Sequence, residues 1–208
     1  MTTIETGELV RTDGSKVACS VVHGWNPKAS LECDTMWKQA SFELLSHIMS
    51  QNYDDKELIE VVSSISMEDD HWRWFDKAMA LTSKEYEWFH LYAENKPQAV
   101  CVIYHPKQSA LASGDIFYVE FVAVAPWNRS CKVRERDFRR VGKTLLRAAL
   151  RFAVKTLKLR PGFCLHSLPG ANGFYRSLEM VNVPKLDKDP LLYFELPPDL
   201  AKKLMEDV

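Results

Sequence analysis

Residues 116–126 read Ile-Phe-Tyr-Val-Glu-Phe-Val-Ala-Val-Ala-Pro. Apart from Glu120, every residue before the proline is apolar or aromatic, and a run of this kind predicts a central strand buried on both faces and ended by Pro126. An acid inside such a strand is costly unless it is paired or takes part in chemistry. Glu120 is therefore either a base or substrate contact, or a paired structural carboxylate, and the sequence leaves both interpretations open.

A basic loop and an amphipathic helix follow this strand. From Gly142 to about Lys158 the apolar residues recur at helical spacing, and basic residues repeat every four positions on the other side. The start of a helix presents unpaired backbone N–H groups and a positive dipole end, which favour phosphate. Arg139, Arg140 and Lys143 add charge there, and Gly142 lets a ligand approach the backbone closely.

The rest of the chain predicts a mixed sheet with helices packed on it. Strands are expected at Val17–His23, in a hairpin of Trp88–Ala93 with Ala99–Tyr104, at 163–166, and in a final hairpin whose second strand is Leu191–Leu196. Helices are expected at about 35–50, at about 54–80 in one or two pieces, and at about 173–178. No repeat or low-complexity linker divides the 208 residues, so we expect one α/β (α+β) domain with a central sheet of about 6–7 strands.

Three segments together resemble the GNAT N-acetyltransferase family. Residues 119–126 resemble its fourth strand, residues 139–146 its pyrophosphate loop and following helix, and residues 171–180 its segment with a Phe-Tyr pair and a closing Leu-Gly-Phe. The three occur in the family's order. Alignment on Leu145-Leu146 puts Arg140 and Gly142 on the two loop glycines, whereas alignment on Arg139 puts Thr144 where a small residue is usual. Glu179 replaces the glycine of Leu-Gly-Phe.

The resemblance implies a GNAT fold over 1–208 that uses acetyl-CoA as co-substrate. Residues 1–95 would form the variable acceptor side, 96–180 the acetyl-CoA-binding core, and 181–208 a C-terminal hairpin and tail. The backbone of Val122 and Val124 would pair with the pantetheine arm. The pyrophosphate would be held by the loop residues Arg139, Arg140, Val141, Gly142, Lys143 and Thr144.

The implied reaction is direct attack of a neutral amine on the thioester in a ternary complex. Glu120 would accept the amine proton, and Tyr175 would protonate the departing thiolate. His166 ends a strand that points to the same cleft, so its imidazole is a third catalytic candidate, with a structural histidine as the alternative. The acceptor would be an amine of a small molecule or a peptide that the sequence does not identify.

Composition sets further bounds on the function. The net charge of −1 argues against wholesale attraction to nucleic acid or to an anionic membrane. No apolar run has the length of a membrane helix, and residues 1–14 lack a signal core. The five scattered cysteines form neither a metal site nor a disulfide framework, which favours a reducing cytoplasm and no metal. A monomer and a homodimer are both compatible with the sequence.

The segment 129–160 is strongly basic. Residues 128–160 contain twelve Lys and Arg against two acids. Our preferred interpretation is that some of these charges meet the CoA phosphates and the others form a solvated helix face. Nucleic-acid binding through this block is the alternative, and it would fit an enzyme that acetylates aminoacyl-tRNA. A third hypothesis is a GNAT-fold module that binds CoA without turnover, because Arg140 and Glu179 depart from the family pattern.

Overall fold

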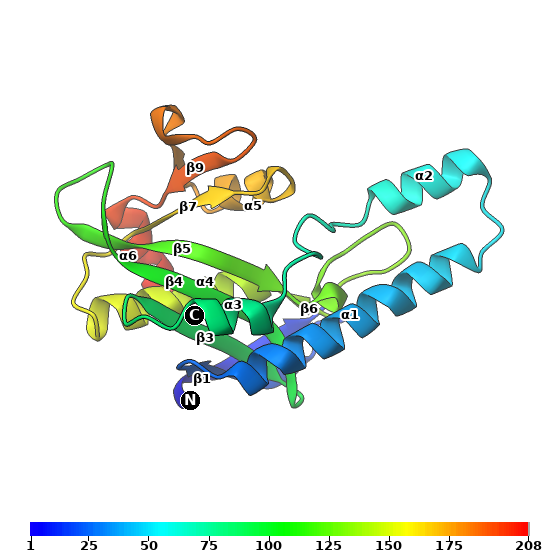
Figure 1. Cartoon of the computed structure of the whole chain (residues 1–208), viewed down its shortest axis with the longest axis horizontal. Coiled ribbons are helices and arrows are strands. Elements are labelled where there is room, and N and C mark those ends of the chain that lie inside the picture. Colours follow the sequence, from blue (N-terminus) through cyan, green and yellow to red (C-terminus); the bar gives the residue numbers. More distant parts are fainter. Residues whose placement is uncertain (208) are drawn as a thin grey trace.

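The structure is a computed structural model that describes residues 1–207 (Figure 1). Strands β1 to β9 are Thr2–Arg11, Lys16–His23, Tyr86–Ala93, Lys96–Gln108, Asp115–Val124, Phe138–Arg139, Phe163–Ser167, Val181–Asn182 and Leu192–Glu195. Helices α1 to α6 are Pro27–Met49, Asp55–Ser63, Trp74–Ala80, Val141–Lys155, Asn172–Ser177 and Pro198–Glu206. Short 3₁₀ turns lie at Pro126–Asn128, Pro169–Ala171 and Pro184–Leu186.

The strands form one mixed sheet in the order β6-β1-β2-β3-β4-β5-β7-β9-β8. The only parallel pair among the described residues is β5 with β7. The sheet has nine strands, so the expectation of 6–7 was too low. β1 is largely exposed, with Leu9 as its buried residue, and therefore carries no alternating apolar signal. β6 and β8 have two residues each, too few to show a period.

Two apolar layers enclose the sheet. On one face, α4 and α6 pack in a core that includes Phe117, Leu145 and Leu204. On the other face, α1 and α3 pack in a second core around Trp37, Trp74 and Trp88. Figure 1 shows α1 and α3 crossing this second face, while α1 and α2 extend beyond the sheet as an arm. The four aromatic rings of Trp37, Trp72, Trp74 and Phe121 meet edge to face along this layer.

Several helix limits differ from the sequence expectation. α1 begins at Pro27 rather than near 35, because the Asn26 side chain accepts from the N–H groups of Lys28 and Ala29 and caps the helix there. The 54–80 segment forms two helices, α2 and α3. The C-terminal tail folds as α6, whose Ala201 and Leu204 are buried against the core of α4. Within 181–208, β8 and β9 pair antiparallel as the expected hairpin, and only the segment expected as a tail differs, because it forms α6.

The structure also bears on membrane crossing and on the state of the cysteines. Within residues 1–207, no helix combines the length and the apolar character that crossing a membrane requires. All five cysteines are free thiols; four of them are buried and Cys131 is partly exposed. Burial raises the pKa of Cys164 to about 12, which keeps this thiol protonated at neutral pH.

The packing of β5 against β7 predicts how much stability the protein loses when the ring of Phe117 is removed. Phe117 is fully buried and stacks on Phe163 with ring centroids 5.3 Å apart. We expect Phe117→Ala to lower the free energy of unfolding by about 3–5 kcal/mol, measured by denaturant titration. Phe42→Ala on α1 is the control, because Phe42 is 67% exposed and its loss should change stability by less than about 0.5 kcal/mol. Equal effects of the two changes would contradict the packing described here.

Candidate functional site

A β-bulge in β5 creates the centre of the site. Val102 of β4 pairs with Phe121, but the next residue, Ile103, pairs with Val119, so Glu120 is an extra residue without a partner. An extra residue breaks the alternation of a strand and re-aims the side chains around it. Phe121 packs in the core beneath α1 and α3, whereas Val119 and Val122 pack in the α4 core. The bulge thus places Glu120 beside Phe121 on the α1/α3 side of the sheet.

The edge of β5 that faces β7 is unpaired beyond the first few residues. Parallel pairing covers only Phe117 with Phe163 and Tyr118 with Cys164. The Ala125 N–H donates to Gln98 in β4, so strand alternation turns the backbone groups of Val122 and Val124 away from β4 and toward the gap. The Val124 carbonyl accepts from the Arg129 guanidinium at 2.8 and 3.0 Å. Both groups of Val122 and the Val124 N–H remain available for an extended ligand.

The start of α4 faces the same gap. Arg140, at the N-cap, has φ of +58° and makes no side-chain cap, so the N–H groups of the first turn have no partner within the helix. A Cβ on Gly142 would lie 3.5 Å from Val124 and 3.7 Å from Phe174, so Gly142 brings the helix close to β5 and α5. The helix start, α5 and the free edge of β5 converge at this point.

These elements enclose an open cleft of about 260 Å³. The cleft brings together six of the residues expected in the site, namely Val122, Val124, Arg140, Val141, Gly142 and Tyr175. Arg139, Lys143 and Thr144 do not line it. The Arg139 guanidinium donates to the Thr12 carbonyl at 2.8 Å, and Lys143 pairs with Asp207 at 2.5 Å. Of the three basic residues predicted at the start of the helix, only Arg140 therefore lines the cleft, together with Arg129 and Arg136.

Tyr175 lies in this cleft on the α4 side. Its side chain is buried, with its ring against Phe174 and Phe194. Burial raises the pKa of its phenol, so the hydroxyl stays protonated over the working range of most enzymes. The structure therefore puts a proton donor on the wall of the cleft.

Glu120 and His166 lie on the opposite side of the sheet and do not line this cleft. Glu120 is half-buried, and burial raises its carboxyl pKa against the opposing effects of Lys188, Lys77 and His166. His166 Nε2 lies 2.8 Å from the Leu186 carbonyl, which can only accept, so that nitrogen carries the hydrogen. Nδ1 then faces the Tyr118 hydroxyl at 2.8 Å. Both ring nitrogens of His166 are thus bonded within the fold, and its catalytic role stays a prediction.

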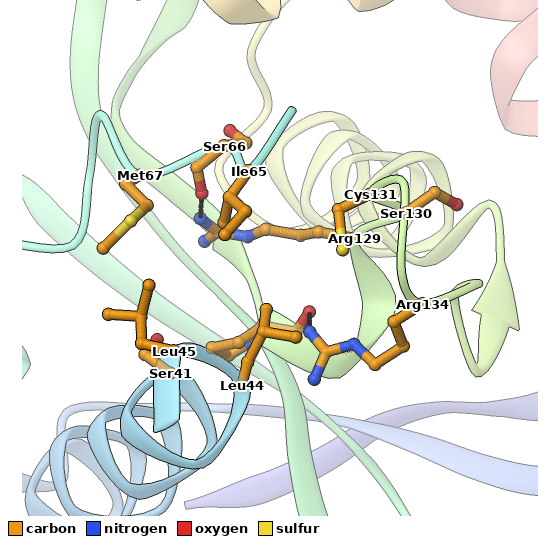
Figure 2. A pocket seen from close by; sticks show the side chains of 11 residues that line it. Ser41, Leu44, Leu45, Ile65, Ser66, Met67, Arg129, Ser130, Cys131 and Arg134 are labelled. Atoms are coloured by element: carbon orange, nitrogen blue, oxygen red, sulfur yellow. Dashed lines mark hydrogen bonds between the residues drawn. The ribbon is translucent and has the colours of Figure 1, made fainter. Parts of the chain in front are cut away.

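Sequence reasoning missed a segment that crosses the cleft. Residues 64–73, between α2 and α3, run along its mouth, where Ser66, Glu68 and Asp69 line it. Arg129 holds one side by bonding both Asp69 carboxylate oxygens at 2.6 Å and the Ser66 carbonyl at 3.0 Å; Figure 2 shows this guanidinium reaching Ser66. On the other side, the Gly170 N–H donates to Glu68 at 2.8 Å. Acidic residues recur over 54–70 and basic ones over 129–160, but no local pattern shows that these two segments pair, because their contact depends on the fold.

A second, smaller pocket lies behind this segment. Figure 2 shows Leu44 and Leu45 of α1 facing Ile65, Met67 and Cys131. Its volume of about 20 Å³ holds roughly one water, so it cannot take a substrate. Residues 1–207 also contain no cluster of three His, Cys, Asp or Glu side chains arranged to bind a metal.

Much of the basic block is neutralised within the fold. Five of its side chains pair with carboxylates: Arg129 with Asp69, Lys132 with Glu60, Lys143 with Asp207, and both Arg147 and Arg151 with Glu5. Arg147 and Arg151 also bond carbonyls of the C-terminal segment. Much of the charge density in the sequence is therefore used to attach α6 and the loop after β5. Nucleic-acid binding stays an untested prediction.

The two departures from the family pattern share one backbone feature. Arg140 has φ of +58° and Glu179 has φ of +59°, and both values lie in the left-handed region that glycine adopts most readily. This backbone geometry favours the alignment that puts Arg140 on the first loop glycine. The chain thus keeps a glycine-like backbone at both positions, at a cost of roughly 1–2 kcal/mol each.

Solved structures agree with this arrangement. An apo nucleotide-linked sugar GNAT, FdhC, superposes with a TM-score of 0.54 at 10% identity over 89% of each chain. The GNAT domain of S. lividans PAT gives a TM-score of 0.52 at 11% identity, over 92% of this chain and 96% of that one. The chain has the GNAT fold.

An uncharacterised protein of Bacillus halodurans also matches, with a TM-score of 0.51 at 10% identity over 99% of this chain and 96% of the other. No family model and no curated protein matches the sequence. The cleft between β5, α4 and α5 involves the three segments that resemble the GNAT family, residues 119–126, 139–146 and 171–180. Those three segments do converge on it.

Proposed function

We propose that the protein is an acetyl-CoA-dependent N-acetyltransferase that acts on a primary amine. The observation that carries the proposal is the convergence of an unpaired β5 edge, an uncapped α4 N-terminus and Tyr175 on one cleft. An extended arm with amide groups suits the free edge of Val122. A pyrophosphate suits the N–H groups at the start of α4.

In this proposal Glu120 and Tyr175 act on the reacting groups from opposite sides of the sheet. The amine nitrogen forms a bond to the thioester carbonyl carbon, and the C–S bond then breaks. Glu120 takes the amine proton, directly or through water, because its raised pKa brings its basicity closer to that of the amine. Tyr175 donates a hydrogen bond or its proton to the departing sulfur. The gap between β5 and β7 lets the two groups act on one reacting centre from opposite faces.

The α4 N-terminus gives the first test. We expect Gly142→Asp to weaken acetyl-CoA binding at least 10-fold in calorimetry, because a carboxylate would face the pyrophosphate. Gly142→Asn has nearly the same size without the charge, so the difference between the two variants isolates the electrostatic part. Unchanged affinity in a folded Gly142→Asp protein would show that the phosphates bind elsewhere.

Glu120 gives the second test. Glu120→Gln should lower kcat by about 10²–10⁴-fold and leave acetyl-CoA affinity nearly intact, since the carboxylate acts on the amine. In the parent protein, turnover should fall as the pH drops through the pKa of Glu120, which lies above its usual value of about 4.3. That limb of the pH profile should vanish in the variant. Turnover equal to the parent's would make Glu120 structural.

Tyr175→Phe separates chemistry from packing because it keeps the ring and removes the hydroxyl. The general range for a positioned acid is about 10²–10⁴-fold in rate. We expect the lower end, because a free thiol has a pKa near 8.5 and leaves fairly well unaided, while burial raises the pKa of Tyr175. Steady-state kinetics and a melting curve of the variant distinguish a catalytic hydroxyl from a packing residue. Normal turnover with a lower melting temperature would make Tyr175 a packing residue.

A further inference from the structure

Lys77 of α3 is a half-buried cation beside Glu120. Its ammonium nitrogen lies 3.4 Å from the centroid of the Phe121 ring and 5.0 Å from that of Trp72. No carboxylate oxygen of residues 1–207 lies within 4.0 Å of it, although buried lysines are usually paired. The rings offset part of the burial cost through cation–π attraction. Rings accept no strong N–H bond, so the ammonium donors stay available to a ligand.

The nearby carboxylates do not pair with Lys77. Asp34 accepts from the N–H groups of Trp74 and Phe75 at 2.7 and 2.9 Å, where it caps α3. Glu120 is close enough to act electrostatically on Lys77 but lies beyond ion-pair distance. The acids around Lys77 therefore leave its charge incompletely balanced.

A second lysine and a histidine also lower the pKa of Glu120 against the effect of burial. Lys188, between the Pro184–Leu186 turn and β9, and His166 both act on the Glu120 carboxylate. Burial lowers the pKa of Lys77, which shows that its charged form is poorly compensated as it stands. The one carboxylate that would take the acceptor's proton thus lies within electrostatic range of two lysines, Lys77 and Lys188. An acceptor that brings a second ammonium to this place would be repelled.

We infer that the acceptor is an amine that carries a carboxylate or a phosphate within a few atoms of its nitrogen, with Lys77 as the residue that recognises the anionic group. This inference rests on the proposed function, because Glu120 marks where the amine must lie. With the amine at Glu120, the neighbouring atoms of the acceptor come close to Lys77, whose ammonium lies over the ring of the adjacent Phe121. An anion there would replace the missing counter-charge through charge-assisted hydrogen bonds.

Matched acceptor pairs test the inference by thiol release from acetyl-CoA. Each pair compares an amine with and without an anionic group: α-amino acids against their α-carboxamides, and phosphoethanolamine against ethanolamine, with cadaverine as a dicationic amine. We expect kcat/KM to be about 10–100-fold higher for the anionic member of at least one pair, the range of hydrogen bonds to charged groups. The two kinds of pair distinguish a carboxylate from a phosphate. Equal or better use of the uncharged or dicationic amines would overturn the inference.

Lys77→Met keeps an apolar stem on Phe121 and removes the charge. It should lower kcat/KM for the anionic acceptor about 10–100-fold, mainly through KM, whereas the uncharged partner should show only the smaller change that follows from the altered charge beside Glu120. Lys56→Met on α2, an exposed lysine away from the site, is the matched control and should change neither. An equal loss for both members of a pair would make Lys77 a packing residue and overturn the inference.

Binding measurements separate this inference from the proposed function. Absence of thiol release with every amine would contradict the proposed function alone. Calorimetry of the same pairs with CoA-saturated protein would then decide the inference: tighter binding of the anionic member, lost in Lys77→Met, supports it, and equal binding of both members overturns it.

Discussion

At Glu120 the register between β4 and β5 shifts by one extra residue, and the rest of the site is arranged around this bulge. The bulge puts Glu120 and Phe121 on the α1/α3 side while Val119 and Val122 stay in the α4 core. A regular strand would put successive side chains on opposite faces, so Glu120 and the ring beneath Lys77 would be separated. The parallel pairing of β5 with β7 also ends just before this point, at Tyr118. The bulge therefore places the Glu120 carboxylate next to the part of the β5 edge that β7 leaves unpaired.

The open edge matters because two other elements are fixed beside it. α4 starts at Val141 after a left-handed Arg140, and its uncapped first turn faces the cleft. Residues 64–73 cross the mouth, held by Arg129 on the β5 side and by Glu68 on the Gly170 side. Arg129 also occupies the Val124 carbonyl, so the part of the β5 edge that a ligand can use is centred on Val122. These contacts define a slot with a polar backbone at one end and aromatic side chains at the other.

The sequence predicted those parts of this arrangement that local patterns determine. β5, α4 and the hairpin of β3 and β4 have strong apolar runs or periods, and each was found close to its expected place. β1 was missed because a strand with one buried residue looks polar, and α6 was missed because only Ala201 and Leu204 are buried in its nine residues. The backbone positions around Val122 and Gly142 could be assigned from the resemblance. The bulge at Glu120, the Arg129–Asp69 pair and the setting of Lys77 depend on contacts between distant segments, and no local pattern encodes them.

The proposed function depends on the position at which acetyl-CoA binds, and a crystal structure of the protein with acetyl-CoA tests that position most directly. It should show the pyrophosphate within hydrogen-bond distance of the N–H groups of Val141, Gly142 and Lys143, and the pantetheine arm bonded to the backbone of Val122. The thioester should lie in the gap between β5 and β7, between Glu120 and Tyr175. Acetyl-CoA bound away from the α4 N-terminus, with the β5 edge at Val122 left free, would contradict the account.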